Sequence, residues 1–261
     1  MNILRCVGRL VGWIYRGCDR IFIQSRAFRD SVVHRGGANR RIHYLPNFAE
    51  EMFRPLTASL EEPEAALMPR GFRIMFAGNI GVSQDFETIL SAAEITRGRQ
   101  EIKWIILGEG RRKAWLVREL SRRSLNNVYL LGRHPKERMP VFFSMADVML
   151  VSLKKEPLFA LTIPSKIQAY LACAKPIIAS LDGEGARIIE EAEVGAAVPA
   201  ENPMALAEAV IRLSQVDALV LDDMVIKARK YYDEHFSRTH ILDEFEKVLY
   251  QACEPDVDSC G

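Results

Sequence analysis

The sequence predicts an α/β protein built on a doubly wound parallel sheet. Short apolar runs alternate with amphipathic segments, and the clearest runs lie at residues 148–151, 177–179 and 196–198. Such runs are typical of strands buried on both faces, and the amphipathic segments at 166–173 and 203–213 are typical of crossover helices. We therefore expect a Rossmann-like domain of about six strands over residues 71–219.

The predicted elements of this domain follow one another at regular spacing. Strands are expected at 72–77, 102–107, 127–131 and 147–151, and helices at 85–96, 111–123 and 138–145. Three further strand and helix steps complete the domain. Two helices near 220–234 and 238–252 are expected to cross back to the first part of the chain, leaving a tail at 253–261.

The segment before this domain is too short to form a second one. An amphipathic helix at 1–17, two strands at 20–24 and 42–45 and a helix between them are all that the pattern supports. Two strands cannot bury both faces of a sheet. Residues 1–47 are therefore expected to be the remnant of a second, incomplete lobe, and the prolines and acidic residues of 48–70 predict a linker.

Composition excludes several classes of protein. Lys and Arg number 35 against 34 Asp and Glu, so the charge balance implies no general affinity for nucleic acid. The 5 cysteines are scattered without metal-ligand spacing, which favours a reduced cytoplasmic compartment and predicts no metal site. Arginines interrupt the N-terminal apolar positions, so neither a signal peptide nor a membrane span fits.

The strongest candidate for a binding site is the predicted helix start at Thr162-Ile163-Pro164-Ser165-Lys166. A Thr cap and a Pro in the first turn would leave free N–H groups and a positive dipole end, which suits a diphosphate. Lys166 and the Ser165 hydroxyl would then stabilise charge on a leaving oxygen. The alternative is that Lys166 extends into solvent at an ordinary helix start.

Three loops at predicted strand ends carry further candidates, each with a plain alternative. Gly78-Asn79-Ile80-Gly81 would let backbone approach a sugar or phosphate, or it is a tight turn; the turn at 108–110 is expected at the surface. Arg133 would contact a nucleobase, or it is a solvated arginine. Glu184 would accept hydrogen bonds from ribose or sugar hydroxyls, or it lies in a surface loop.

Five motifs in this order resemble the C-terminal domain of family 4 glycosyltransferases: FAGNIGVSQDFETIL (76–90), IILGEGRRKAWL (105–116), VYLLGRHPKERMPVFFSMADVMLVSLKKE (128–156), PSKIQAYLACAKPIIAS (164–180) and VGAAVPAENPMALAEAV (194–210). Residues 18–47 are similar to the end of the family's acceptor-binding domain. The resemblance implies the GT-B fold, transfer with retention from a nucleotide sugar, for which we expect UDP as the carrier, and no metal cofactor. GNIG and PSKIQAYLA look most like bacterial O-antigen and capsule enzymes, including N-acetylfucosamine transferases.

The chain also departs from the family pattern. The two positions at which the family usually has glutamates are Leu161 and Ala169, and Glu156 lies out of register. The usual phosphate-binding Arg is Asn79, the usual Lys is Gln84 or Asp85, and the Gly before Lys175 is Ala174. These departures leave Lys166 as the main cationic candidate.

The sequence leaves two questions of function open. The chain is either a transferase that acts on a saccharide or lipid-linked acceptor or a noncatalytic nucleotide-sugar binding subunit; a sugar-nucleotide 2-epimerase would need carboxylates and histidines that we do not identify. The basic helix at 1–17 either lies on the inner face of the membrane or packs on a separate N-terminal domain.

Overall fold

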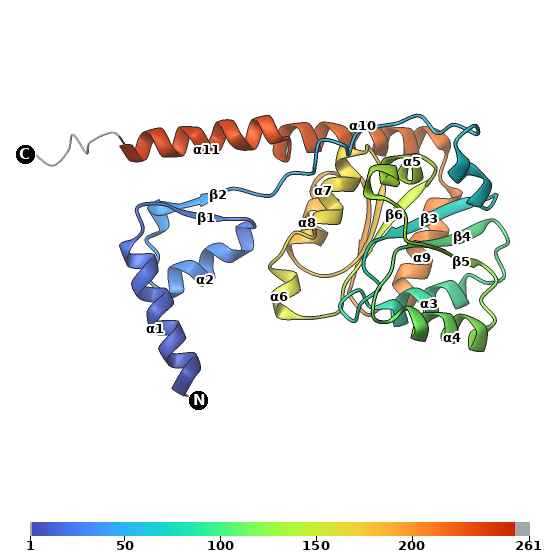
Figure 1. The fold of residues 1–261 in the computed structure, drawn as a ribbon, viewed down its shortest axis with the longest axis horizontal. Helices are drawn as coiled ribbons and strands as arrows, with labels where there is room; N and C mark the ends of the chain where they lie inside the picture. Colours follow the sequence, from blue (N-terminus) through green and yellow to red (C-terminus); the bar gives the residue numbers. More distant parts are fainter. Residues whose placement is uncertain (1, 254–261) are drawn as a thin grey trace, which may run out of the picture.

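The computed structural model describes residues 2–253, and a six-stranded sheet with helices on both faces forms its largest part (Figure 1). The strands lie in the order β5-β4-β3-β6-β7-β8, and all neighbouring strands are parallel. They are β3 (Phe72–Ala77), β4 (Ile102–Leu107), β5 (Val128–Gly132), β6 (Val148–Ser152), β7 (Ile177–Ser180) and β8 (Gly195–Val198). The chain winds outward from β3 in one direction and from β6 in the other, so the predicted doubly wound fold is confirmed.

Successive side chains of each strand point to opposite faces of the sheet, and this divides the core between two helical layers. In β3, Ile74 and Phe76 face one layer, and Met75 and Ala77 face the other. The first layer holds α3 (Phe86–Ile95), α4 (Lys113–Arg123) and α9 (Pro203–Gln215); the second holds α5 (Met139–Ser144), α7 (Ser165–Ala172), α8 (Glu184–Glu191) and α10 (Ala218–His235), with the short α6 (Pro157–Ala160) before α7. Full burial of each large apolar side chain contributes about 1.5–3 kcal/mol, so this two-sided core dominates the stability of the domain.

The first segment forms a separate two-stranded parallel sheet. Its elements are α1 (Asn2–Gly17), β1 (Ile21–Ile23), α2 (Arg29–His34) and β2 (Ile42–Tyr44), with single 3-10 turns at Arg26–Phe28 and Asn39–Arg41. Its small core consists of Ile21, Ile23, Val32 and Ile42. From α1 only Tyr15 packs against this core among the described side chains, whereas Ile3 is 79% exposed and Trp13 is 69% exposed.

The connection at residues 45–70 is packed onto the large domain, although its prolines indicated a spacer. It contains one short 3-10 helix (Pro63–Leu67) and is otherwise irregular. The Phe53 ring stacks on Phe143 with centroids 5.9 Å apart, and Arg138 forms ion pairs of 2.6 Å with both Glu62 and Glu64. We call residues 45–55 of this connection the strap, because they contact α5 through Phe53 and α7 through a 2.8 Å hydrogen bond from Gln168 to the Asn47 carbonyl.

The C-terminal helices link the two parts of the molecule. Arg229 on α10 donates a 2.8 Å hydrogen bond to the carbonyl of Ala172 at the end of α7. Helix α11 (Arg238–Cys253) continues along nearly the same line to the first segment (Figure 1). There the Phe245 ring lies 5.1 Å from the ring of Phe22, and Arg20 donates to the carbonyl of Gln251. Residues 254–261, most of the predicted tail, lie outside the described residues.

Ala174→Gly is expected to stabilise the protein by up to about 1 kcal/mol. Ala174 follows α7 with φ +54°, a left-handed conformation that costs a residue with a Cβ roughly 1–2 kcal/mol. Glycine removes this strain but loses a buried methyl group and has a more flexible unfolded state. Urea unfolding measures the change. Ala92→Gly, inside α3 where the backbone is helical, is the control and should destabilise the protein. Equal losses of stability in the two variants would show that the backbone of Ala174 is not strained.

Candidate functional site

Two glycine loops interlock at the carboxyl end of the sheet. The Gly78 amide donates to the Leu107 carbonyl at 2.9 Å, and the Ile80 amide donates to the Glu109 carbonyl at 2.7 Å. Gly108 has φ +144°, and a Cβ there would lie 1.8 Å from the Gly78 carbonyl oxygen. The turn at 108–110, which was expected only to lie at the surface, therefore also packs against the loop at 78–81 and supports its conformation.

Lys166 reaches from the start of α7 across the end of β3. Its Nζ lies 3.7 Å from the centroid of the Phe76 ring, a cation–π contact. A Cβ on Gly78 would lie 2.6 Å from Lys166 Cε, so the side chain passes directly over this glycine. Burial lowers the pKa of the Lys166 amine to about 7, and no ion pair with Lys166 is found among residues 2–253. The alternative in which Lys166 extends into solvent is wrong.

The predicted Thr cap of this helix is also wrong. Helix α7 begins at Ser165 with Pro164 at its N-cap, and Pro164 makes no side-chain capping bond. The Thr162 hydroxyl instead donates to the Phe159 carbonyl at 3.0 Å, which closes the preceding turn. Thr162 lies too early in the chain to reach the first amides of α7. The Ile167 amide donates to the Pro164 carbonyl at 2.9 Å. The Ser165 and Lys166 amides, which no side chain caps, are available to an anion.

A cavity of about 640 Å³ lies on the β4 and β5 side of Gly78 and brings together three predicted residues, Gly78, Asn79 and Arg133. Arg133 is exposed, and His134 is held in place by a 2.9 Å hydrogen bond with the Leu131 carbonyl and by the Phe142 ring. The other lining residues are Leu107, Gly108, Glu109, His134, Pro135, Lys136 and Met139. The space is large enough for part of a nucleotide, with Arg133 at its wall.

A second cavity of about 320 Å³ lies on the other side of Gly78, between the strap and α7, and contains Ser165 and Lys166. Its walls are mainly apolar and are formed by Phe48, Ala49, Phe53, Ala77, Met139, Phe143, Ala169 and Tyr170, with Glu50 and Lys136 as further polar residues. Gly78, Lys136 and Met139 line both cavities, so the two spaces adjoin. Together they place Asn79, Arg133, Ser165 and Lys166 around Gly78.

Gly81 and Glu184 lie away from these cavities. Gly81 donates its amide to Gln84 Oε1 at 3.2 Å, inside its own loop. Glu184 is in the first turn of α8, so the surface loop expected there is wrong. Its carboxylate is buried and pairs with Arg187 at 2.9 Å. The suggestion that Glu184 binds ribose or sugar hydroxyls stays a prediction, and it would require this ion pair to open.

Sequence reasoning missed the residues that the strap and α5 contribute. Phe48, Glu50 and Phe53 belong to a proline-rich segment without periodicity, which gave no sign that it faces the site. Tyr170 is a buried residue of α7 whose hydroxyl bonds the backbone of Ala77, and it also lines the smaller cavity.

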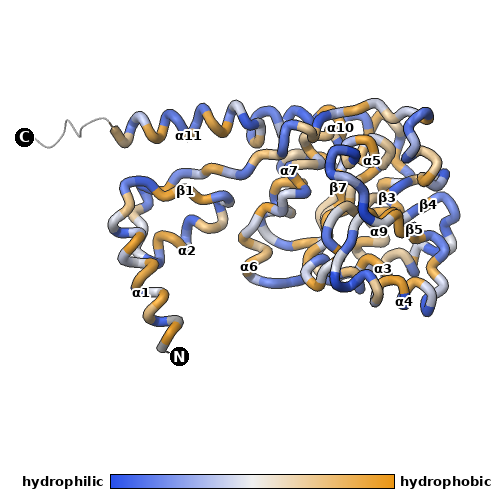
Figure 2. Tube along the Cα trace, viewed as in Figure 1, coloured by the Kyte–Doolittle hydropathy of each residue, from blue (hydrophilic) through white to orange (hydrophobic). Residues whose placement is uncertain are grey.

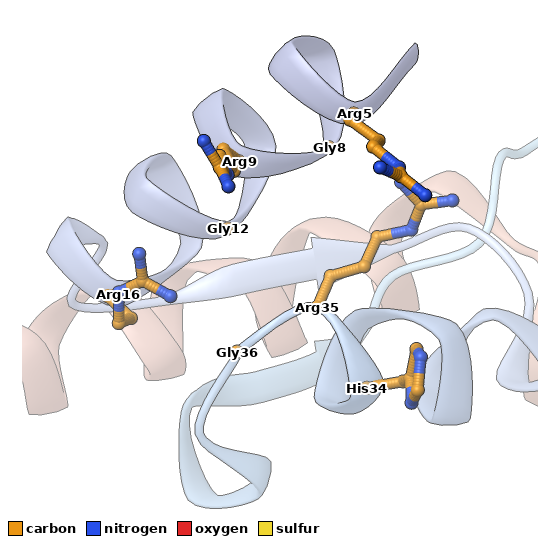
Figure 3. A pocket seen from close by; sticks show the side chains of 8 residues that line it. All are labelled: Arg5, Gly8, Arg9, Gly12, Arg16, His34, Arg35 and Gly36. Carbon is orange, nitrogen blue, oxygen red and sulfur yellow. The ribbon is translucent and has the colours of Figure 1, made fainter. Parts of the chain in front are cut away.

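A separate basic groove of about 590 Å³ lies between α1 and the end of α2. Figure 3 shows three arginines of α1 and the arginine that follows α2 along it; the lining residues are Arg5, Gly8, Arg9, Gly12, Arg16, His34, Arg35 and Gly36. Gly12 allows close approach, because a Cβ there would lie 2.7 Å from the Arg35 carbonyl oxygen. Orange and blue residues alternate along α1 in Figure 2, as its amphipathic sequence requires. Among the described residues, none of the helices combines the length and the hydrophobicity that a membrane span requires.

The family model described as glycosyl transferases group 1 matches residues 71–215, more than half of the chain. The chain belongs to this family. It is 27% identical over 253 residues to the probable glycosyltransferase WbjE of Pseudomonas aeruginosa, covering 92% of this chain and 60% of that protein. It is 26% identical to the putative colanic acid biosynthesis glycosyl transferase WcaI of Escherichia coli K12, covering 87% and 56%. The chain thus spans little more than half the length of these relatives.

Several solved structures share the fold at low sequence identity. Anabaena Alr3699/HepE, crystallised in complex with UDP, gives a TM-score of 0.81 at 14% identity, over 92% of this chain and 66% of that one. Sucrose-phosphate synthase from Thermosynechococcus elongatus gives 0.76 at 18% identity, over 95% and 61%. The GT-B fold implied by the sequence motifs is therefore confirmed for this group 1 chain.

Proposed function

We propose that this chain is the donor-binding part of a glycosyltransferase that takes a sugar from a nucleoside diphosphate, with UDP as the carrier. The observation that carries the proposal is the position of Lys166, which lies over Gly78 where two cavities adjoin at the carboxyl end of the sheet. Ligands of doubly wound folds bind at this end. HepE, which shares this fold, was crystallised in complex with UDP, and this supports the choice of UDP.

In this mechanism the nucleobase lies beside Arg133 and the diphosphate lies against Gly78, Asn79 and the start of α7. Negative charge builds on the diphosphate oxygen as the glycosidic bond breaks. Lys166, protonated by the approach of the phosphates, and the free amides of α7 stabilise that charge, with the Ser165 hydroxyl as a further donor. The stabilisation grows as the bond breaks, so these groups lower the barrier to transfer.

The motifs and the relatives support a proposal for the acceptor and the stereochemistry. WcaI is described as a colanic acid biosynthesis enzyme, which supports a role in bacterial surface polysaccharide synthesis. We propose family 4 chemistry with retention, a hexose or an N-acetyl-deoxyhexosamine such as N-acetylfucosamine as the donor sugar, and a saccharide or lipid-linked acceptor. Transfer would take place in the cytoplasm. Residues 1–47 would be the remnant of the acceptor-binding domain.

Product analysis tests this proposal. The chain is incubated with a panel of nucleotide sugars, with and without a supplied N-terminal domain, and the mass and anomeric configuration of each product are determined. We expect an α-linked product from a UDP-α-sugar only when the N-terminal domain is present. An inverted product would contradict retention, and binding without turnover in the reconstituted protein would contradict transfer.

A noncatalytic nucleotide-sugar binding subunit is the second candidate. It is favoured by Ala169 and Leu161, which stand where the family resemblance leads one to expect carboxylates. Ala169 lies at the wall of the smaller cavity. Neither side chain can donate or accept a hydrogen bond. The two candidates share the binding site, so only turnover in the same product analysis distinguishes them.

Helix α1 is proposed to pack on the absent part of the acceptor-binding domain. The relatives are longer than this chain, and the apolar face of α1 is exposed beside a sheet of two strands. Contact with the inner face of the membrane is the alternative, which the arginines of the basic groove favour. Binding to vesicles of anionic lipid, with and without the supplied domain, separates these roles.

A further inference from the structure

The smaller cavity contains a single carboxylate among its lining residues, and the strap supplies it. Lys136 and Lys166 can only donate hydrogen bonds, and Ser165 can donate or accept. The Tyr170 hydroxyl already bonds the Ala77 backbone at 3.3 Å. The remaining lining residues offer apolar side chains or glycine backbone. Glu50 is therefore the strongest acceptor available to a ligand with hydroxyl groups.

The position of Glu50 relative to the two cavities follows from Lys136. Lys136 lines both cavities, and its ammonium group pairs with the Glu50 carboxylate. The carboxylate therefore lies near the junction, where Gly78 and Met139 are also shared. It comes from the strap, whereas Lys136 begins the 3-10 turn Lys136–Arg138 before α5.

A nucleotide that spans both cavities would place its ribose at this junction. In the proposed function the base lies beside Arg133 in the larger cavity, and the diphosphate lies at Gly78 and Lys166. Ribose connects these two parts, so its 2′- and 3′-hydroxyls come within the region that Glu50 can reach. A carboxylate offers two oxygens to two neighbouring hydroxyl donors, which is a strong charge-assisted arrangement.

We infer that Glu50 accepts hydrogen bonds from the ribose hydroxyls of the bound nucleotide, and thus selects ribonucleotides over deoxyribonucleotides. This inference rests on the proposed function. The Glu50 side chain is 54% exposed, as is that of Lys136, so the carboxylate can turn toward a ligand without unpacking the core. Exposed ion pairs of this kind are weak and are readily exchanged for a stronger partner.

Calorimetry on the full 261-residue chain with UDP and 2′,3′-dideoxy-UDP tests the inference. In the wild type, UDP is expected to bind about tenfold or more tightly than the dideoxy compound, the scale of a hydrogen bond to a charged group. Glu50→Ala should bring this ratio close to one, and Glu50→Gln should retain part of it. Loss of the ion pair between Glu50 and Lys136 changes the affinity for both ligands alike, so its effect cancels in the ratio of the two affinities.

Glu51→Ala is the matched control. Glu51 is the next residue of the strap, pairs with Arg238 at 2.8 Å and lies outside both cavities. It should keep the wild-type ratio. An unchanged ratio in Glu50→Ala, with UDP still bound, overturns the role of Glu50 and leaves the proposed function standing. Failure of the wild type to bind UDP overturns the proposed function, and the inference with it.

Discussion

Lys166→Ala is expected to weaken UDP binding by about 10- to 100-fold and to leave uridine binding unchanged. The lost interaction is a charge-assisted hydrogen bond to phosphate, worth roughly 1.5–3 kcal/mol. Uridine has no phosphate, so it should not sense the change. Lys166→Arg should recover only part of the affinity, because the guanidinium group places its charge differently and must still pass over Gly78. Titration calorimetry with both ligands measures these differences.

Lys175→Ala is the control for the loss of a buried lysine. Burial also lowers the Lys175 pKa, to about 8, but this residue lies before β7, at the amino end of the sheet, and lines neither cavity. Its replacement should leave UDP affinity unchanged if the protein stays folded. Equal UDP affinity in wild type and Lys166→Ala would show that Lys166 does not hold the diphosphate.

The pH dependence of binding gives a second measure of the same contact. The free Lys166 amine has a pKa of about 7, and a bound diphosphate would raise it, so binding takes up a proton above that pH. UDP affinity should therefore fall as pH rises from 7 to 9, a range in which the terminal phosphate, with a pKa of about 6, is already ionised. Lys166→Met should remove this slope.

Much of the fold could be predicted because the physical pattern was local and repeated. Strands such as Ile177–Ser180 are continuous apolar runs, and helices such as Pro203–Gln215 are amphipathic, so each element carries its own signal. The strap carries none. Its packing depends on single contacts, such as Phe53 on Phe143, between residues far apart in sequence, and its prolines are equally compatible with a free spacer.

The site was only partly predictable for a related reason. The sequence identified Lys166 and the Gly78 loop separately, but their contact depends on β3 lying beside β6 and on the reach of one side chain. Thr162 was assigned as a cap from residue type alone, whereas the helix starts too late for its hydroxyl to serve. Glu184 resembled a free loop carboxylate because Gly183 and Gly185 flank it, yet Gly183 is the N-cap of α8.

Gly78→Ala is expected to weaken UDP binding about as much as Lys166→Ala. Gly78 has φ +141°, and a Cβ there would lie 2.6 Å from Lys166 Cε and 3.0 Å from Nζ. The methyl group would push the lysine off the Phe76 ring and out of its position at the cavity junction. The strained backbone should also cost about 1–3 kcal/mol of folding stability, so binding is measured well below the unfolding temperature of the variant.

The double variant Gly78→Ala/Lys166→Ala separates this mechanism from a general disturbance of the loop. If the glycine acts by admitting the lysine, the double variant should bind UDP little worse than either single variant, since residues in direct contact are not additive. Gly98→Ala is the control, because a Cβ on Gly98 meets no atom within 4 Å, and it should bind as the wild type does. Losses that simply add would mean that Gly78 contributes through its backbone shape, independently of Lys166.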